Sequence, residues 1–257
     1  MAELSGSMVL ITGASSGFGE ACAHAFAGEG ARLVLAARRR DRLETLAEEL
    51  RSRYGSDVFL LGLDVRDRAA VEEQLGSLPD EWRGIDVLVN NAGLSRGLDK
   101  LHEGSIQDWE EMIDTNVKGL LYVSRTVIPW MVARKRGTVI NIGSIAGHEV
   151  YPKGNVYCAT KHAVAALTRG MRQDLLGTGV RVCSVDPGLA ETEFSIVRFR
   201  GDAARARTVY DGLQPLNGED VAQAVLFCAS QPAHVQVAEL ILLPSAQASS
   251  TLVHRGE

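Results

Sequence analysis

The chain has 257 residues, 46% of them hydrophobic, and carries a formal net charge of −5 at pH 7. A chain of this size can bury a substantial core within one α/β domain. The acidic balance argues against non-specific nucleic-acid binding, which requires a basic surface, and no apolar stretch approaches the roughly 20 residues of a membrane span. We therefore expect one domain over residues 1–257, with neither nucleic acid nor membrane as its partner.

The first residues and the cysteines bear on the cellular compartment. Residues 1–6 lack a cationic segment followed by an apolar one, so they do not resemble a signal peptide. The four cysteines, which include no Cys-x-x-Cys pair, are Cys22, Cys158, Cys183 and Cys228. Such dispersed cysteines are typical of reduced thiols in a cytoplasmic protein, and neither they nor the histidines show the spacing of a metal site.

Short apolar runs alternate with segments of helical periodicity along the whole chain. Strands are predicted at 8–11, 32–36, 58–61, 87–89, 138–142, 180–185 and 240–243. Helices are predicted at 17–29, 40–53, 67–77, 106–134, 155–177 and 218–229. Strands that are apolar throughout are typical of a parallel sheet covered on both faces, and the intervening helices imply right-handed crossovers. The fold class is therefore α/β: a Rossmann-like, doubly wound parallel sheet of about seven strands with helices on both faces.

A glycine-rich stretch follows the first predicted strand and opens the first predicted helix. It reads Thr12-Gly13-Ala14-Ser15-Ser16-Gly17-Phe18-Gly19. Glycine allows a tight turn without a Cβ between ligand and backbone, and a helix N-terminus offers unpaired N–H groups to a diphosphate. A strand–helix turn that binds nothing is the alternative, but the position after the first strand of an α/β chain favours a dinucleotide site.

The end of the second predicted strand indicates which dinucleotide is bound. It reads Leu35-Ala36-Ala37-Arg38-Arg39-Arg40, with no acidic residue before Asp41. An NAD site usually places a carboxylate here to bind the ribose hydroxyls, whereas arginine binds a 2′-phosphate through charge-assisted bonds. NADP is therefore favoured, with Arg38 and Arg39 as phosphate ligands; the alternative is a solvated basic start of a helix.

A second motif carries acid–base chemistry. Tyr157 and Lys161 are four residues apart on a predicted helix and share one face. A free phenol has a pKa of about 10, and a nearby ammonium favours the phenolate. Ser144 ends a predicted strand, where it can hold a substrate oxygen beside the phenol. Alone, Tyr-x-x-x-Lys is common in helices; together the two motifs predict an enzyme that passes a hydride between a nicotinamide and a carbonyl.

The order and spacing of these motifs resemble the short-chain dehydrogenase/reductase family over nearly the whole chain. Its Gly-x-x-x-Gly-x-Gly spacing is present, and the other matching segments are Asp64-Val65, Asn90-Asn91-Ala92-Gly93, Asn116, Ser144, Tyr157-x-x-x-Lys161 and Pro187-Gly188. The resemblance implies that Asp64 bonds the adenine, that the Asn-Asn-Ala-Gly turn lines the adenosine side, and that Pro187-Gly188 and Thr192 approach the nicotinamide.

The resemblance also assigns roles in catalysis. It places Lys161 on the nicotinamide ribose and Asn116 in a water-linked proton relay through that lysine. The residues expected to be catalytic are Asn116, Ser144, Tyr157 and Lys161. The residues expected to bind the cofactor are Gly13, Ser15, Ser16, Gly17, Phe18, Gly19, Arg38, Arg39, Asp64, Val65, Asn91, Ala92, Gly93, Tyr157, Lys161, Pro187, Gly188 and Thr192.

Within the family, the chain is similar to NADP-dependent 3-hydroxy acid dehydrogenases, which oxidise serine, allo-threonine and related small acids. The supporting segments are 77–82, 112–116, 154–157, 192–199 and 231–235, with His254-Arg255 in the tail; Ala190-Glu191 departs from that pattern, which has glycine there. A small carboxylate needs a cation, and Arg198 in the irregular segment 189–217, expected to be a substrate lid, is the first choice beside Ser144. Arg200, Lys153 and His148 are alternatives, and residues 244–257 form a polar tail.

Two other functions stay open. One is an NADPH-dependent reductase of another ketone or aldehyde, including a biosynthetic or acyl-carrier substrate, which would need a basic docking patch. The other is a non-catalytic NADP-binding sensor or scaffold, which would be expected to lack one of Ser144, Tyr157 and Lys161. The resemblance further implies a homo-oligomer, a dimer or homotetramer, in which the long helices 106–134 and 155–177 pair between copies.

Overall fold

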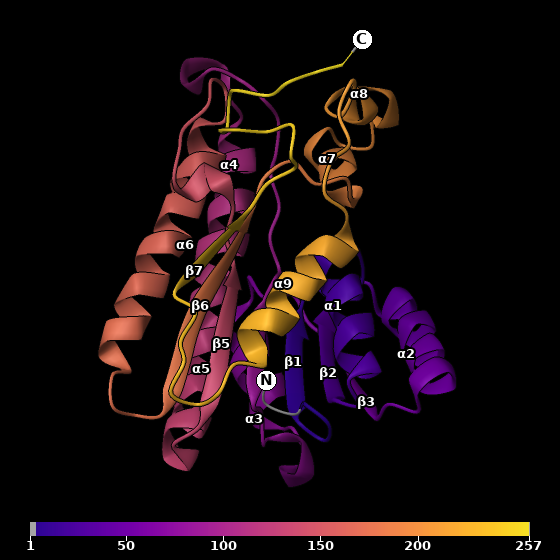
Figure 1. Cartoon of the computed structure of the whole chain (residues 1–257), viewed down its shortest axis with the longest axis vertical. Coiled ribbons are helices and arrows are strands. Elements are labelled where there is room, and N and C mark those ends of the chain that lie inside the picture. Colours follow the sequence, from indigo (N-terminus) through magenta and orange to yellow (C-terminus); the bar gives the residue numbers. More distant parts are fainter. Residues whose placement is uncertain (1–3, 257) are drawn as a thin grey trace.

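Seven apolar strands pair in parallel at the centre of the molecule (Figure 1). The computed structural model describes residues 4–256; residues 1–3, part of the segment examined for a signal, and residue 257, the end of the predicted tail, lie outside the described residues. The strands are β1 (Met8–Thr12), β2 (Arg32–Ala37), β3 (Val58–Gly62), β4 (Val87–Asn90), β5 (Gly137–Ile142), β6 (Val180–Pro187) and β7 (Glu239–Leu242). Their order is β3-β2-β1-β4-β5-β6-β7, which confirms the predicted doubly wound α/β fold.

Helices cover both faces of the sheet because successive side chains of each strand point to opposite sides. In β1, Val9 and Ile11 belong to one buried cluster and Met8 and Leu10 to the other. The first cluster packs beneath α1 (Gly17–Gly28), α2 (Arg40–Tyr54) and α9 (Gly218–Ala229). The second packs beneath α3 (Arg68–Gly76), α5 (Leu120–Arg134) and the C-terminal part of α6 (Asn155–Asp174). A strand buried on both faces has no polar side, as its sequence predicts.

The predicted helix 106–134 is interrupted. It consists of α4 (Ile106–Ile113), a π-helical segment η3 (Asp114–Gly119) and α5, so the prediction of one regular helix is wrong in its middle. A π-helical turn leaves the α-helical hydrogen-bond pattern over a few residues, and such turns occur frequently at functional sites. Three short 3₁₀ helices lie in the connections between the main elements: η1 (Asp80–Trp82), η2 (Leu101–Glu103) and η4 (Ile145–Gly147).

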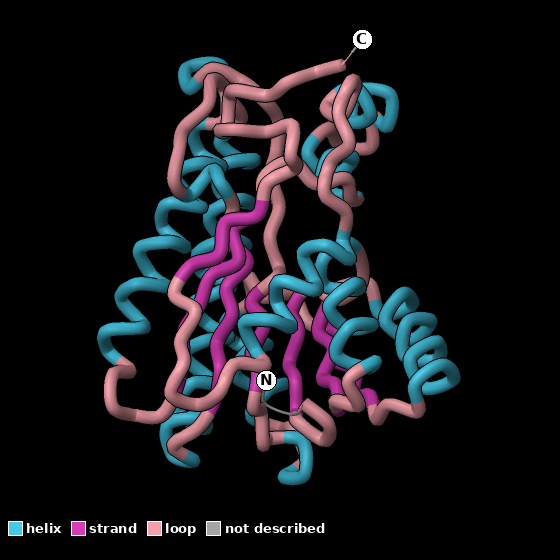
Figure 2. The backbone as a smooth tube through the Cα atoms, in the orientation of Figure 1, coloured by secondary structure: helices cyan, strands magenta, loops and turns pink. Residues whose placement is uncertain are grey.

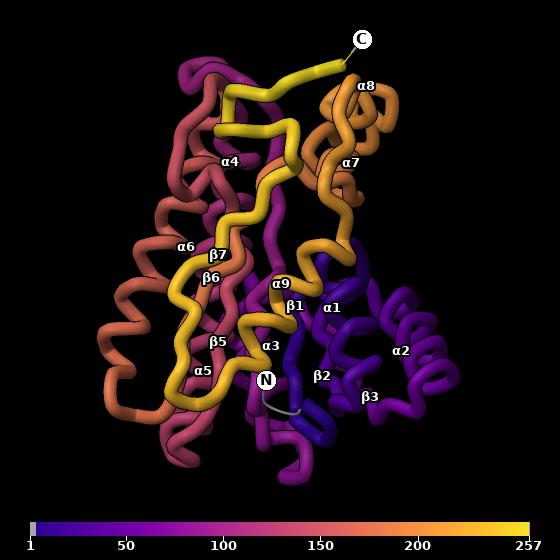
Figure 3. The backbone as a smooth tube through the Cα atoms, viewed as in Figure 1, coloured from indigo at the N-terminus to yellow at the C-terminus, as the bar shows by residue number. Residues whose placement is uncertain are grey.

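The strand order changes direction between β1 and β4, and ligands of open α/β sheets bind at the carboxyl edge beside such a point. Loops and short helices extend beyond this edge (Figure 2). The expected lid contains two short helices that the sequence did not predict, α7 (Glu193–Arg198) and α8 (Ala203–Thr208). A bridge between Ala190 and Leu216 joins the two ends of the lid, and the tail crosses the same end of the molecule (Figure 3).

None of the helices among residues 4–256 combines the length and the apolar character needed to span a bilayer.

Candidate active site

The glycine-rich turn is held in place by contacts that only glycine permits. Gly13 has φ +65°, a conformation that side chains rarely adopt. A Cβ on Gly19 would lie 2.4 Å from the carbonyl oxygen of Gly13, so α1 starts in direct contact with the turn that precedes it. Ser16 at the N-cap of α1 makes no side-chain capping bond, which leaves the first N–H groups of the helix without that partner.

The turn after β4 is bonded to this glycine-rich turn. The side-chain amide of Asn91 donates to the carbonyl oxygens of Thr12, at 2.9 Å, and Gly13, at 3.2 Å. The Thr12 hydroxyl accepts from the backbone N–H groups of Asn91 and Ala92. The amide of Asn91, expected to face a cofactor, is therefore used to fix the two turns together, although the residue still lines the cavity described next.

A cavity of about 630 Å³ runs along the carboxyl edge from the glycine-rich turn to the lid. Most of the residues predicted to bind cofactor or to act in catalysis line it. These are Gly13, Ser15, Ser16, Gly17, Phe18, Arg38, Arg39, Val65, Asn91, Ala92, Gly93, Ser144, Tyr157, Lys161, Pro187, Gly188, Thr192 and Arg198. The geometry therefore brings together residues that are up to about 185 positions apart in the chain, since Gly13 and Arg198 line the same space.

Three predicted residues do not line the cavity: Gly19, Asp64 and Asn116. Gly19 is packed against the turn. The carboxylate of Asp64 accepts from the guanidinium of Arg66 at 2.6 and 3.0 Å and from its backbone N–H. Burial alone raises the pKa of Asp64, but these bonds hold it below its usual value. The expected adenine contact of Asp64 stays a prediction, and the carboxylate already has a cationic partner.

Arg39 joins three parts of the site at the end of β2. Its guanidinium donates to the hydroxyl oxygens of Ser15, at 3.2 Å, and Ser16, at 2.7 Å. It also pairs with the lid carboxylate of Glu193 at 3.0 Å, which pairs in turn with Arg42 at 2.6 Å. Burial raises the pKa of Glu193, but hydrogen bonds from Arg42 and Arg39 outweigh it and hold the pKa below the usual value.

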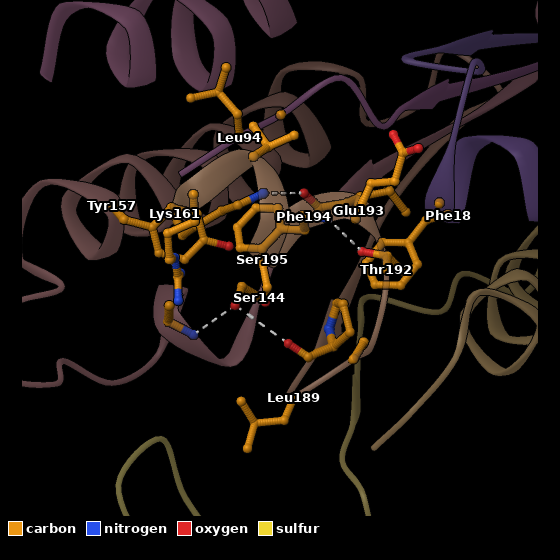
Figure 4. Close-up of a pocket in the computed structure, with 18 of the residues that line it drawn as sticks. Phe18, Leu94, Ser144, Tyr157, Lys161, Leu189, Thr192, Glu193, Phe194 and Ser195 are labelled. Atoms are coloured by element: carbon orange, nitrogen blue, oxygen red, sulfur yellow. Dashed lines mark hydrogen bonds between the residues drawn. The ribbon is translucent and has the colours of Figure 1, made fainter. Parts of the chain in front are cut away.

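Tyr157 lies in α6 and is 8% exposed, with its ring facing the lid (Figure 4). The ring of Phe194 is 5.6 Å away between centroids, and the Cζ atom of Arg198 lies 5.3 Å from the Tyr157 centroid. Burial and the neighbouring Tyr151 raise the pKa of Tyr157, while Arg198 and a hydrogen bond with Ser144 lower it by less. The expected lowering of this pKa by Lys161 is therefore not seen, because burial is the largest effect on the phenol.

Lys161 lies one turn further along α6 and is 7% exposed. Its ammonium donates to the carbonyl oxygen of Ile142 at 2.9 Å and lies 5.9 Å from the centroid of the Tyr157 ring. Burial lowers the pKa of Lys161 to about 8, and the charge of Asp186 opposes that shift. Tyr157 and Lys161 thus share one helix face, as their spacing predicts.

Ser144 stands between the ends of β5 and β6. Its hydroxyl oxygen accepts from the backbone N–H of Ala146 at 3.1 Å and donates to the carbonyl oxygen of Pro187 at 3.4 Å (Figure 4). One acceptor position of this hydroxyl is thereby used. Its hydrogen bond to the Pro187 carbonyl oxygen is long, so a ligand oxygen can take the place of that carbonyl as acceptor. Ser144 faces the same cavity as Tyr157.

The side chain of Asn116 forms hydrogen bonds with neighbouring parts of the chain. Its amide donates to the carbonyl oxygen of Leu94 at 2.8 Å and to the hydroxyl of Thr160 at 3.0 Å, and its oxygen accepts from the Leu94 N–H. Asn116 lies in the π-helical segment and reaches the residue next to Lys161, not the ammonium itself. Its place in a proton relay stays a prediction.

Arg198 differs from the other predicted cations of the lid region. One of its nitrogens donates to the hydroxyl of Tyr151 at 3.1 Å, while its buried Nε has no hydrogen-bond partner among residues 4–256. Arg200 instead pairs with Asp108, and His148 pairs with Asp186 at 3.0 Å. Lys153 is exposed and, like these two, does not line the cavity.

Several residues of the cavity wall were not singled out from the sequence. They are Tyr151, Glu193, Phe194, Ser195, Tyr210, Gln247, Ser250, Thr251, Val253 and Arg255. The tail residues reach the site because Gln247 accepts from the Leu189 N–H at 2.8 Å and Arg255 donates to the Val209 carbonyl oxygen at 3.1 Å. These contacts depend on chain crossings that no local sequence pattern encodes.

Comparisons with known proteins agree with this geometry. The family model described as short chain dehydrogenase matches residues 7–202. The NADP-dependent 3-hydroxy acid dehydrogenase of Salmonella typhi is 49% identical over 250 residues, which cover 96% of this chain and 99% of that protein. The NADP-dependent 3-hydroxy acid dehydrogenase of Schizosaccharomyces pombe is 44% identical over 256 residues, 99% of each chain. A solved closed form of serine dehydrogenase complexed with NADP+ has a TM-score of 0.91 and 48% identity, covering 96% of this chain and 99% of that one.

Proposed function

This chain belongs to the short-chain dehydrogenase family, and from that premise we propose that it interconverts a small 3-hydroxy acid and the 3-oxo acid. It is an NADP-dependent dehydrogenase that acts on a hydroxyl group. The observation that carries the substrate class is the position of Arg198: a guanidinium with a free, buried Nε lies over the ring of Tyr157 in the same cavity. A cation that close to the predicted acid–base group selects substrates with an anionic group near the reacting carbon.

The residues at the β1–α1 end fit the phosphates of NADP. The start of α1 lacks a side-chain cap, and the hydroxyls of Ser15 and Ser16 lie beside the guanidinium of Arg39. Arg38 is exposed at the rim of the same cavity. Two guanidiniums, two hydroxyls and uncapped N–H groups form a donor set suited to a phosphate monoester and a diphosphate. We infer that Arg38 and Arg39 hold the 2′-phosphate.

At the other end of the cavity, Tyr157 is proposed to exchange the proton of the substrate hydroxyl. When bound, NADP supplies the hydride acceptor for oxidation, and its reduced form supplies the donor for the reverse reaction. Lys161 provides positive charge on the same helix face, and Ser144 offers a hydroxyl that can hold the substrate oxygen next to the phenol. Burial raises the pKa of Tyr157, and the charge of Arg198 opposes that shift and favours the phenolate when a proton must leave.

Arg198 is proposed to bind the substrate carboxylate. Its Nε and the nitrogen that now contacts Tyr151 together present two parallel donors, the arrangement that matches a carboxylate. Phe194 supports the guanidinium from one side, with 5.0 Å between Cζ and the ring centroid. The apolar support and the buried donor leave the cation poorly hydrated, which strengthens its attraction for an anion.

The deciding experiment follows NADPH absorbance with a panel of matched substrates. L-serine, L-allo-threonine and 3-hydroxypropionate test the hydroxy acids, and their methyl esters and the corresponding amino alcohols test the need for the carboxylate. The proposal expects kcat/KM to fall at least about tenfold when the carboxylate is masked, because a charged hydrogen bond contributes about 1.5–3 kcal/mol. Equal or better turnover of the esters, or of neutral ketones in reduction, would assign the chain to a reductase of other carbonyls.

A further inference from the structure

Asp186 is a buried carboxylate that the proposed reaction does not use. It lies in β6 directly before Pro187 and is 2% exposed. Its Oδ2 accepts from the hydroxyl of Ser184 at 2.8 Å and lies 3.0 Å from Nε2 of His148. Its Oδ1 fills the space where a Cβ of Gly143 would stand, 1.7 Å from that position. A carboxylate this deep in the protein needs partners, and its position beside Gly143 puts it next to the chain segment that carries Ser144.

His148 closes the loop that begins at Ser144. The loop turns through η4, with the N–H of His148 donating to the carbonyl oxygen of Ile145 at 3.0 Å, and the imidazole then returns to Asp186. The side chain of His148 is 17% exposed, so this contact is largely shielded from water. Gly143 and His148, the two ends of the loop, therefore both contact the carboxylate of Asp186, and Ser144 lies between them in the chain.

The charge of this carboxylate also acts on the ammonium of Lys161. That ammonium donates to Ile142, the residue before Gly143, and a carbonyl oxygen offers no full negative charge. Lys161 is buried, and burial without a counter-charge disfavours the protonated form. The charge of Asp186 opposes this effect on Lys161. Burial raises the pKa of Asp186 itself, and its bonds with His148 and Ser184 and the charge of Lys161 limit that rise and favour the ionised form.

We infer that Asp186 and His148 form a positioning pair for the active site: Asp186 keeps Lys161 an ammonium, and His148 fixes that carboxylate and the Ser144 loop. The role of the pair in catalysis rests on the proposed function, but the effect of the Asp186 charge on Lys161 does not. Neither residue lines the cavity, so the pair acts through Lys161 and Ser144 and touches no substrate.

Other charged and titratable groups surround the pair, and the test must distinguish their electrostatic effects from those of Asp186 and His148. Arg169 and Arg172 of α6 and Glu239 of β7 lie on elements packed around the pair. Glu239 pairs with Arg169 at 2.7 Å, and the charge of His148 acts on its carboxylate. The thiols of Cys183 on β6 and Cys228 on α9 sense the charge of Asp186. Glu239 is the matched control, because the charge of His148 acts on this carboxylate too and it is more exposed than Asp186.

The test is a titration of Lys161 by NMR in the chain without cofactor or substrate. The chain has five lysines, Lys100, Lys118, Lys135, Lys153 and Lys161, so ¹³Cε-lysine labelling gives few signals, and Lys161→Met assigns the one of interest. In Asp186→Asn, the Lys161 midpoint should fall by about one pH unit or more, because an opposite charge nearby contributes a shift of that size. The other four midpoints, and that of Lys161 in Glu239→Gln, should not move. An unchanged Lys161 midpoint in Asp186→Asn would overturn the inference.

A second pair of variants tests the role of His148 and covers a failure of Asp186→Asn to fold. His148→Leu removes the donor that favours the ionised form of Asp186, so Asp186 should keep its proton to higher pH and the Lys161 midpoint should fall. His148→Gln retains an amide donor and should restore the wild-type midpoint. An unchanged or higher Lys161 midpoint in His148→Leu would contradict the pairing.

The catalytic meaning is tested by the pH profile of kcat/KM. Asp186→Asn should move the alkaline limb to lower pH in step with the NMR midpoint, whereas a merely structural disturbance would lower kcat at all pH values without moving that limb. The ligand-free NMR result is independent of the reaction, which is tested separately by substitution of Tyr157. A moved NMR midpoint with an inactive wild-type chain would therefore reject the proposed function and leave the charge pair standing.

Discussion

The guanidinium of Arg198 lies over the ring of Tyr157, with 5.3 Å between Cζ and the ring centroid. Arg198 is the last residue of α7 in the lid, and Tyr157 lies in α6 beneath it. The lid therefore brings a cation to the proposed proton-exchanging group and forms one wall of the cavity. Because of this contact, the proposed carboxylate-binding group and the proposed acid–base group lie close together, so one small hydroxy acid can reach both.

Arg198→Met should raise KM for a 3-hydroxy acid about 10–100-fold, because it removes charge-assisted bonds of about 1.5–3 kcal/mol and keeps an apolar stem. Steady-state kinetics with the acid and with its amino alcohol measure the difference. Arg200→Met is the matched control, since Arg200 pairs with Asp108 outside the cavity. An equal effect on both substrates would show that Arg198 shapes the lid and does not bind the carboxylate.

Arg39→Ala should weaken NADPH binding about 10–100-fold and leave NADH binding nearly unchanged, because only NADPH carries the 2′-phosphate. Fluorescence titration of the reduced cofactors gives both dissociation constants. Arg40→Ala serves as the control, since Arg40 is exposed and pairs with Glu44 on the surface of α2. Parallel weakening of both cofactors would point instead to collapse of the contacts that Arg39 makes with Ser15 and Ser16.

Gly19→Ala should lower the free energy of unfolding by about 1–3 kcal/mol, the usual cost of overpacking. The added Cβ would stand 2.4 Å from the carbonyl oxygen of Gly13, a backbone atom that cannot move without the whole turn. Urea unfolding followed by circular dichroism measures the loss. Gly76→Ala at the end of α3, where a Cβ meets nothing within 4 Å, should be close to neutral. Equal stability of the two variants would mean that the turn is not held as tightly as its contacts imply.

Lys161→Met should inactivate the chain yet stabilise the ligand-free fold at pH 7 by on the order of 1–3 kcal/mol, because it removes a buried ammonium. The folded pKa of Lys161 is about 8, below its ordinary 10.5. Between these values the unfolded chain retains a proton that the folded chain has released, so wild-type stability should rise with pH across that window. The advantage of the variant should therefore shrink from pH 8 to pH 10.5 in urea unfolding series. A constant difference would show that the ammonium is not desolvated.

The fold was predictable because its signals are local and repeated. The strands β1 and β2 are apolar on both faces, and each main helix begins within one residue of its predicted start, as with α9 at Gly218–Ala229. The two motifs follow strands whose carboxyl ends meet at one edge, so their convergence in one cavity follows from the parallel topology. The location of the site is thus a consequence of the parallel topology that the pattern of elements predicts.

What the sequence did not predict depends on contacts between distant segments. The π-helical turn at Asp114–Gly119 has no compositional mark, and α7 and α8 are too short to show a helical period. Glu193 meets Arg39 across 154 residues of chain, a distance in sequence that no spacing rule covers. The raised pKa of Tyr157 was likewise missed, because burial of a side chain on a helix face depends on the lid that closes over it.

The central claim is that the Tyr157 phenol exchanges the substrate proton, and Tyr157→Phe tests it most directly. The variant keeps the ring that packs against Phe194 and Arg198, so NADPH binding measured by fluorescence should match the wild type. Turnover of the best 3-hydroxy acid, followed by NADPH absorbance, should fall about 10²–10⁴-fold, the usual contribution of a positioned acid–base group. Turnover within a few-fold of the wild type, with the cofactor bound normally, would contradict the account.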